Sequence, residues 1–102
     1  MPRLIWTSEA LRGVQRCHRF LAESSPAAAS RAVRAIREGM RIVEAHPGAG
    51  RPAEKMPPEF REWLIPFGDS GYVVLYRVDG ELALVLAVRH QREAGYSGSG
   101  SP

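Results

Sequence analysis

The most constraining feature of this sequence is a pair of apolar runs close to its C-terminus. The second run, Glu81 to Val88, is almost wholly apolar, which is typical of a central strand covered on both faces. Asp79-Gly80 separates it from the apolar run Tyr72–Val78, and a two-residue Asp-Gly connection indicates a tight β-hairpin. The chain must therefore supply other elements that cover this sheet.

Two helices are predicted before the hairpin. Thr7 or Ser8 can cap the first, in which apolar residues recur at helical spacing to about residue 24. Ser25 can cap the second, which should run from Pro26 to about Ala45. Because only about two residues connect them, the two helices should form an antiparallel hairpin.

Two further runs complete the predicted sheet, Arg3–Thr7 before the helices and Arg61–Phe67 after them. The order is β-α-α-β-β-β, which predicts an α+β fold with the helical hairpin packed on one face of a small antiparallel sheet. Residues 1–96 should form a single domain, and residues 97–102 read as a flexible Gly/Ser tail. The expected core consists of Val33, Ile36, Met40, Leu84 and Leu86.

The last strand is apolar on both of its faces. Its larger side chains, at positions 82, 84, 86 and 88, are expected to face the helices. Ala83, Val85 and Ala87 should then lie on the opposite face. Two helices can cover only one face of the sheet, so this second face would be left uncovered. Either the loop 46–60 or a partner protein must cover that face, and we favour a partner protein.

Composition excludes several classes of protein. The length of 102 residues allows one domain with a modest core. No apolar run approaches the length of a membrane span, and the N-terminus lacks a signal peptide, so a cytoplasmic protein is expected. Cys17 is the only cysteine, and no His/Cys set has metal-ligand spacing, so neither a metal nor another cofactor is predicted.

Charge is unevenly distributed along the chain. The first 51 residues carry +5 and the remainder carries −2, and thirteen of the fourteen cations are arginine. The arginines of each helix fall at spacings of three and four, which places them on one surface. This surface is either a solvated face with pairs such as Arg34–Glu38, or a binding surface for an acidic or phosphate-bearing partner.

Cationic side chains and a tyrosine follow the last strand directly. These side chains could bind an anionic partner or transfer protons, and they belong to Arg89, His90, Arg92 and Tyr96. Charged residues are also usual where a buried strand ends at the solvent-exposed surface, without any function in binding. A second possible set consists of Arg61, Arg77, His90 and Tyr96. If these four converge, they provide the charge stabilisation, proton carrier and hydroxyl that phosphodiester cleavage needs.

An ordered set of short motifs runs across positions 3–96. It consists of Ser25-Pro26, Ala28, Ala29, Arg31 and Ile36, His46-Pro47, Gly50-Arg51-Pro52, Arg61-Glu62, Tyr72-Val73, Tyr76-Arg77, and the run from Val88 to Arg92. This set resembles the RelE/ParE toxin superfamily and is most similar to its ParE branch.

The resemblance implies a toxin of a bacterial type II toxin–antitoxin module. Its partners would be a ParD-like antitoxin and DNA gyrase, and it would reach operator DNA only through the antitoxin. The RelE-like alternative is a ribosome-dependent mRNA endoribonuclease, which generally uses clustered lysine and arginine. This chain has one lysine, Lys55, in the loop, which favours the gyrase inhibitor, a protein without catalytic residues. A third possibility is a non-toxic, degenerate antitoxin-binding module.

Overall fold

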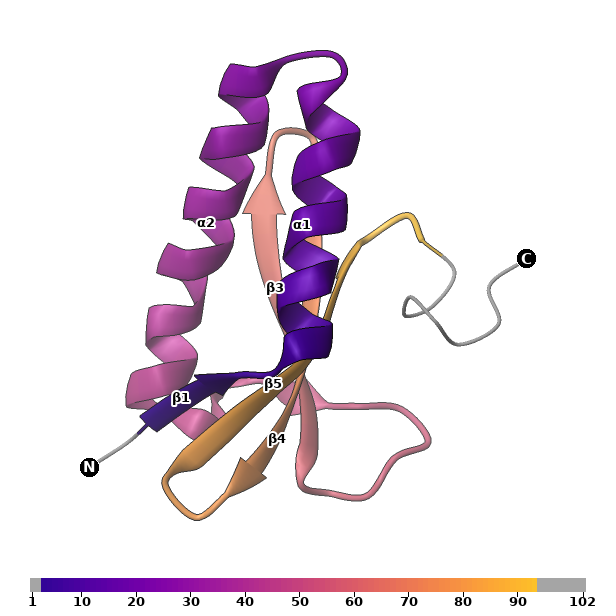
Figure 1. Ribbon diagram of the computed structural model, residues 1–102. Helices are drawn as coiled ribbons and strands as arrows, with labels where there is room; N and C mark the ends of the chain where they lie inside the picture. The colour runs from indigo at the N-terminus through magenta and orange to yellow at the C-terminus, as the bar shows by residue number, and fades with distance from the viewer. Residues whose placement is uncertain (1–2, 94–102) are drawn as a thin grey trace.

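The structure is a computed structural model that describes residues 3–93. These residues form two layers, a helical hairpin packed against a twisted sheet (Figure 1). This confirms the predicted α+β architecture, with both helices on one face of the sheet. In chain order the elements are β1 (Arg3–Trp6), α1 (Ser8–Ala22), α2 (Pro26–Ala45), the 3-10 turn η1 (Pro47–Ala49), β2 (Arg51–Pro52), β3 (Phe60–Phe67), β4 (Ser70–Asp79) and β5 (Leu82–His90).

The sheet has five strands in the order β1-β5-β4-β3-β2. It is mixed, because β1 pairs in parallel with β5 while the other neighbours are antiparallel. The helical hairpin carries the chain from β1 at one edge of the sheet to β2 at the other edge, and β3 and β4 then lead back to β5 beside β1. Strand β2 is not predicted by the sequence, because it has only two residues and lies in a segment rich in glycine and proline.

Capping side chains fix where both helices begin. The Thr7 hydroxyl accepts the Ala10 N–H at 3.2 Å and donates to the Val85 carbonyl at 2.6 Å, so the start of α1 is tied to β5. Ser25 accepts the Ala28 N–H at 3.1 Å and caps α2. These caps confirm the predicted helix starts and set the position of α1 over the sheet.

The predicted orientation of β5 was wrong over its first half. Ala83 and Val85 are fully buried in the core that the helices cover, whereas Leu84 is only half-buried. The cause is the close approach of α1, since a Cβ at Gly13 would lie 2.7 Å from the Val88 carbonyl oxygen. Small side chains therefore face the helix. Substitution of Val85 by glutamate would bury a carboxylate in the core, so it would destabilise the fold and would not act on a binding surface.

A β-bulge changes the pattern in the second half of β5. Leu75 is opposite Ala87 and Tyr76 is opposite Val85, so Leu86 is an extra residue without a partner on β4. After the bulge, the face that packs on the helices continues with Val88 and His90. Ala87 consequently keeps its predicted place on the opposite face.

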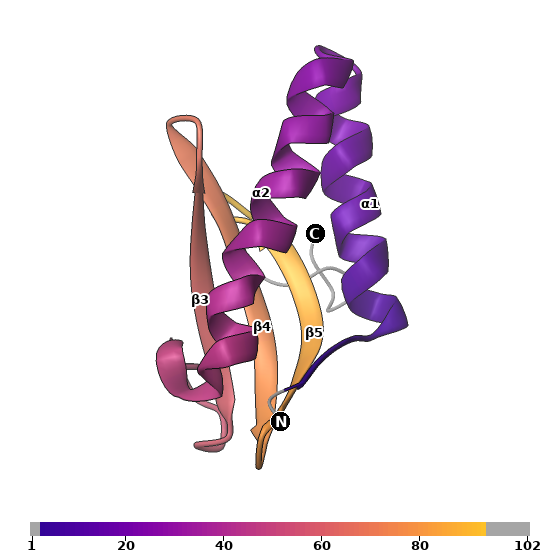
Figure 2. The ribbon, with the colours of Figure 1, turned by 90° about the vertical axis from the view of Figure 1, so that its left-hand side faces the viewer.

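The helices lie on one face of the sheet and leave the second face uncovered (Figure 2). The second face carries apolar side chains, as the sequence predicted, beside Arg77 and Arg89. We call it the open face. It is built mostly from residues other than those predicted. Its exposed or half-buried members include Ile5, Leu64, Leu84 and Ala87, and Ile5 and Leu64 are 36% and 40% exposed.

A candidate binding cleft at the end of strand β5

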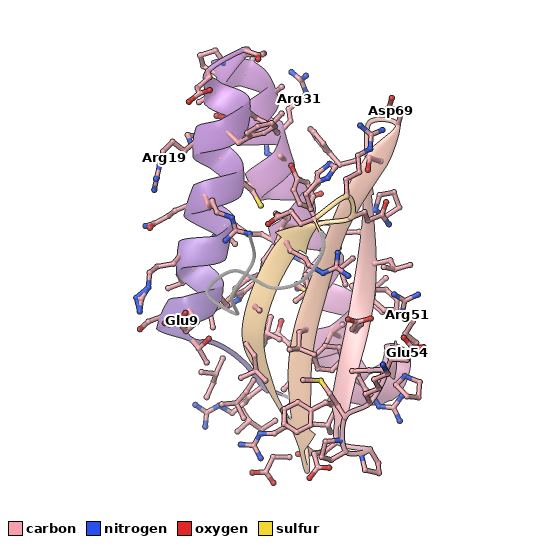
Figure 3. The ribbon with its side chains drawn as sticks, turned by 90° about the vertical axis from the view of Figure 1, so that its right-hand side faces the viewer. Glu9, Arg19, Arg31, Arg51, Glu54 and Asp69 are labelled. Atoms are coloured by element: carbon pink, nitrogen blue, oxygen red, sulfur yellow. The ribbon has the colours of Figure 1, made fainter. Side chains whose placement is uncertain are left out.

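A cleft of about 610 Å³ lies between the second half of α1, the β3–β4 turn and the end of β5. We call it the β5 cleft. Figure 3 shows Asp69 at the tip of the hairpin that forms one of its walls. The side chains that define its character are Arg16, Phe20, Phe67, Tyr72, His90 and Arg92. Three strands and one helix thus bring cations and aromatic rings together.

Aromatic rings line much of this cleft. Tyr72 is 2% exposed, and His90 meets its ring edge-on with centroids 5.5 Å apart. The Phe67 ring centroid lies 6.1 Å from that of Tyr72. Phe20 projects from α1 with 75% of its surface exposed, the largest exposure among the large apolar residues of the described chain. Such a concave apolar surface with a few polar groups is typical of a binding site.

Glu93 holds the chain in place after β5. Both of its carboxylate oxygens accept hydrogen bonds from Arg16 Nη2 at 3.1 Å, and Oε1 also accepts the His90 backbone N–H at 2.8 Å. The guanidinium of Arg89 donates to the Glu93 carbonyl at 2.9 Å. The turn after the strand is therefore bound to α1, and this fixes the direction of the cationic side chains.

His90 is oriented by its own turn. Its Nδ1 accepts the Arg92 backbone N–H at 3.1 Å, so in the neutral ring the proton is on Nε2. The ring edge lies against Tyr72. His90 is therefore positioned as a half-buried donor at the side of the cleft.

The thiol and the phenol that line the cleft stay protonated near neutral pH. Burial raises the pKa of the Cys17 thiol to about 11, with Arg16 partly opposing the rise and Glu93 adding to it. Burial likewise raises the pKa of Tyr72 to about 12, and Cys17 adds to that rise. A reactive nucleophile requires a lowered pKa, so neither group is activated for catalysis.

The set of residues predicted for phosphodiester cleavage does not converge in the part of the chain that the structure describes. Arg61 lies opposite Tyr76, on the helix side of the sheet, whereas Arg77 points to the open face. Arg61 donates to the Gly50 carbonyl at 2.6 Å, a structural role. His90 is opposite Tyr72, five residues from Arg77 along β4, or about 17 Å. Tyr96 lies outside the described residues.

The other predicted set, for target binding, is brought together in part. His90 and Arg92 line the β5 cleft, whereas Arg89 is opposite Val73 and belongs to the open side of the strand. The cleft also contains three residues that were not predicted as site residues, Arg16, Phe20 and Phe67. The available signal was the pair Arg16 and Phe20, four residues apart on one face of a helix, with a large apolar residue where a polar one is usual.

Comparison with known proteins assigns the chain to a family. Residues 4–95 match the family described as the ParE toxin of the type II toxin–antitoxin system parDE. The chain belongs to the ParE toxin family. It is 31% identical over 84 residues to Toxin RelE3 of Caulobacter vibrioides, a match that covers 82% of this chain and 88% of the relative.

A solved structure supports the same assignment. The chromosomal ParDE TA system from P. aeruginosa contains a chain that superposes on this ParE family member with a TM-score of 0.69 and 26% identity. The match covers 88% of this chain and 96% of the other. Within residues 3–93, no group of three potential metal ligands occurs, and no helix is long and apolar enough to cross a membrane.

Proposed function

We propose that this ParE family toxin inhibits DNA gyrase in the cytoplasm by binding it through the β5 cleft. The observation that carries the proposal is the character of the cleft, which combines apolar rings with Arg16, His90 and Arg92. Its thiol and phenol are protonated, and the described members of the phosphodiester-cleaving set lie on opposite faces and at opposite ends of the sheet. This arrangement favours recognition of a protein over catalysis.

The partner that neutralises the toxin is proposed to be a cognate ParD-like antitoxin. Such a partner would cover the open face, where Ile5, Leu64 and Leu84 expose apolar surface. Of the three residues predicted from sequence to bind the antitoxin, only Ala87 belongs to this face. Ala83 and Val85 are buried beneath the helices.

The test compares the activities of single variants in the β5 cleft. Phe20→Ala, His90→Ala and Arg92→Ala should each reduce growth inhibition and the inhibition of supercoiling by purified toxin in a graded manner, since an interface distributes its energy over several side chains. Arg77→Ala is the matched control, because it removes a cation on the open face, outside the cleft.

A second candidate function is ribosome-dependent mRNA cleavage, which the name of the relative Toxin RelE3 makes worth testing. In that case Arg77→Ala or Tyr96→Phe alone should abolish killing, because loss of one catalytic group costs about 10²–10³-fold in rate. Mapping of mRNA ends in the same cells distinguishes the two functions. Codon-specific cleavage together with normal supercoiling would refute gyrase inhibition.

A further inference from the structure

The β5 cleft carries a projection and a hollow side by side. Phe20 projects from α1 at its rim with 75% of its surface exposed, so most of the residue makes no contact within the described chain. The hollow beside it is lined by the rings of Phe67, Tyr72 and His90. A two-fold dimer uses the same patch of both copies, so a patch that holds both a projection and a hollow can match itself.

The rings of the hollow are arranged so that a further ring can join them. Tyr72 meets His90 edge-on and is tilted by 42° against Phe67. Aromatic rings favour such edge-to-face and tilted contacts, and burial of an exposed phenylalanine is favourable in water. Phe20 of a second copy would therefore extend an existing cluster of rings and would lose its contact with solvent.

Two exposed side chains of opposite charge also line the cleft. Arg92 follows β5, and Asp69 lies at the tip of the β3–β4 hairpin (Figure 3). Among residues 3–93, no ion pair involves either side chain. In a two-fold contact, a residue that meets a second residue of the other copy is met in return by that pair reversed. Arg92 of each copy can thus pair with Asp69 of the other, which gives two ion pairs for one contact.

The balance of charge in the cleft decides which kind of partner fits. Arg16 and Glu93 form an ion pair at 3.1 Å, and Arg92 is balanced by Asp69, so the charged lining is neutral as a whole when His90 is neutral. The complete chain carries +3, so two copies repel each other at most of their surface but not here. A nucleic acid would need a cationic surface. A neutral surface with both signs of charge instead matches a partner with the same balance, such as a second copy.

We infer that two copies of this chain associate through their β5 clefts, each with Phe20 in the hollow of the other and Arg92 beside Asp69 of the other. One helix and two turns make a small interface, so the dimer is weak and forms only at high concentration. Because the dimer covers the surface proposed to bind gyrase, self-association and target binding exclude each other. This last consequence rests on the proposed function, whereas the dimer itself does not. The toxin should consequently limit its own activity as its concentration rises.

The test exchanges the two charges and measures self-association by sedimentation over a wide range of toxin concentration. Arg92→Asp and Asp69→Arg are studied singly, as an equimolar mixture, and combined in one chain. Phe20→Ala tests the aromatic contact. Asp79→Arg is the matched control, because it makes the same change at an exposed residue of the other hairpin, outside the cleft. Thermal unfolding of each variant verifies that the fold is intact.

We expect a wild-type dimer that dissociates on dilution. Phe20→Ala should weaken it at least about 30-fold, since the dimer loses two aromatic anchors. Each single charge variant should weaken it at least about tenfold, because like charges then meet twice. The mixture and the combined variant restore opposite charges at both contacts, so their affinity should return to within about threefold of the wild type. Asp79→Arg should change affinity by no more than about threefold.

The masking of the target surface is measured with the same protein. Inhibition of supercoiling by the wild type should increase less than in proportion to total toxin once the dimer forms. If the toxin did not inhibit gyrase at any concentration, the proposed function would fail while the sedimentation results would stay as expected. The two proposals can therefore fail separately.

Three results would overturn the inference. The first is a wild type that stays monomeric up to the limit of its solubility. The second is a dimer that Phe20→Ala leaves unchanged while Leu84→Asp dissociates it, which would place the contact on the open face. The third is a failure of both the mixture and the combined variant to recover affinity, which would show that Arg92 and Asp69 do not meet across the two-fold axis. Inhibition of supercoiling in strict proportion to total toxin, through the range in which the dimer forms, would refute the masking.

Discussion

Gly13→Ala should destabilise the protein, although alanine favours a helix. In an exposed helix the change would stabilise by about 1 kcal/mol. Here the new Cβ would lie 2.7 Å from the Val88 carbonyl oxygen and 3.2 Å from the Val88 nitrogen. Overpacking typically costs about 1–3 kcal/mol, and backbone atoms of a central strand cannot move aside as a flexible side chain does. We therefore place the cost near the top of that range and expect a net loss of about 1–2 kcal/mol.

The measurement is urea or thermal unfolding, in which each kcal/mol lowers the melting temperature of a domain of this size by about 4–8 °C. Two other glycines provide controls. At Gly39 the nearest atoms belong to the Ile65 side chain at 3.0 Å, which can adjust, and at Gly48 nothing lies within 4 Å. The loss should therefore decrease from position 13 to 39 to 48. A Gly13→Ala protein as stable as the wild type would refute the close approach of α1 to β5.

Three further predictions concern the core residue Ile36, the hydrogen bonds of the Tyr76 hydroxyl and the thiol of Cys17. Ile36→Ala, at a fully buried position, should cost about 2–4 kcal/mol in chemical unfolding, and a loss below about 0.5 kcal/mol would mean that another face of α2 is buried. Tyr76→Phe should cost about 1–3 kcal/mol and speed amide exchange after α2, because its hydroxyl accepts the Gly50 N–H at 2.8 Å and donates to the Pro47 carbonyl at 2.7 Å. The Cys17 thiol has a pKa of about 11 in the folded protein, against an ordinary value of 9.0. Between these two pH values the thiol therefore keeps its proton in the folded protein and loses it in the unfolded chain. The free energy of unfolding should then fall as the pH rises from 9 to 11, and it should fall less in Cys17→Ala. The native protein should also react slowly with iodoacetamide at neutral pH. Rapid labelling of the native protein would contradict the burial of the thiol.

The sequence was sufficient to predict the elements that local chemistry determines. Thr7 and Ser25 are caps, α2 ends at Ala45 as expected, and the hairpin turns tightly at Gly80-Glu81, one residue after the predicted Asp79-Gly80, with Gly80 at φ 62°. Each of these features depends on residues close in sequence. The family resemblance, which depends on ordered local motifs, was confirmed for the same reason.

Side-chain size misled the assignment of faces. Leucines were expected beneath the helices because larger apolar residues gain more from burial. The helices instead approach β5 closely, so on α1 and the first half of β5 the fully buried side chains are those of Ala10, Ala83 and Val85, while Leu11 is 49% exposed. The distance between two layers is a tertiary property that depends on residues as distant as Gly13 and Val88. Alternation alone cannot reveal it.

Which residues meet at a binding surface likewise depends on the packing of elements that are distant in sequence. His90 and Arg92 were recognised because they follow a strand directly, and this placement is local. Arg16 and Phe20 become part of the β5 cleft only because α1 crosses the end of that strand, and Glu93 joins them through hydrogen bonds to Arg16. The separation of Arg61 from Arg77 by the sheet follows from strand register, which the sequence does not specify directly.

The bulge at Leu86 has a consequence for how this surface can change over generations. Deleting that one residue would make the pairing of β4 with β5 regular and leave every later residue opposite its present partner, because Ala87 would directly follow Val85 and still face Leu75. His90 would stay opposite Tyr72 on the helix side, and only the local bend of the strand would be lost. The recognition surface should therefore tolerate the loss of a residue at position 86, whereas a deletion at a regularly paired position between it and His90 would turn His90 to the other side of the sheet.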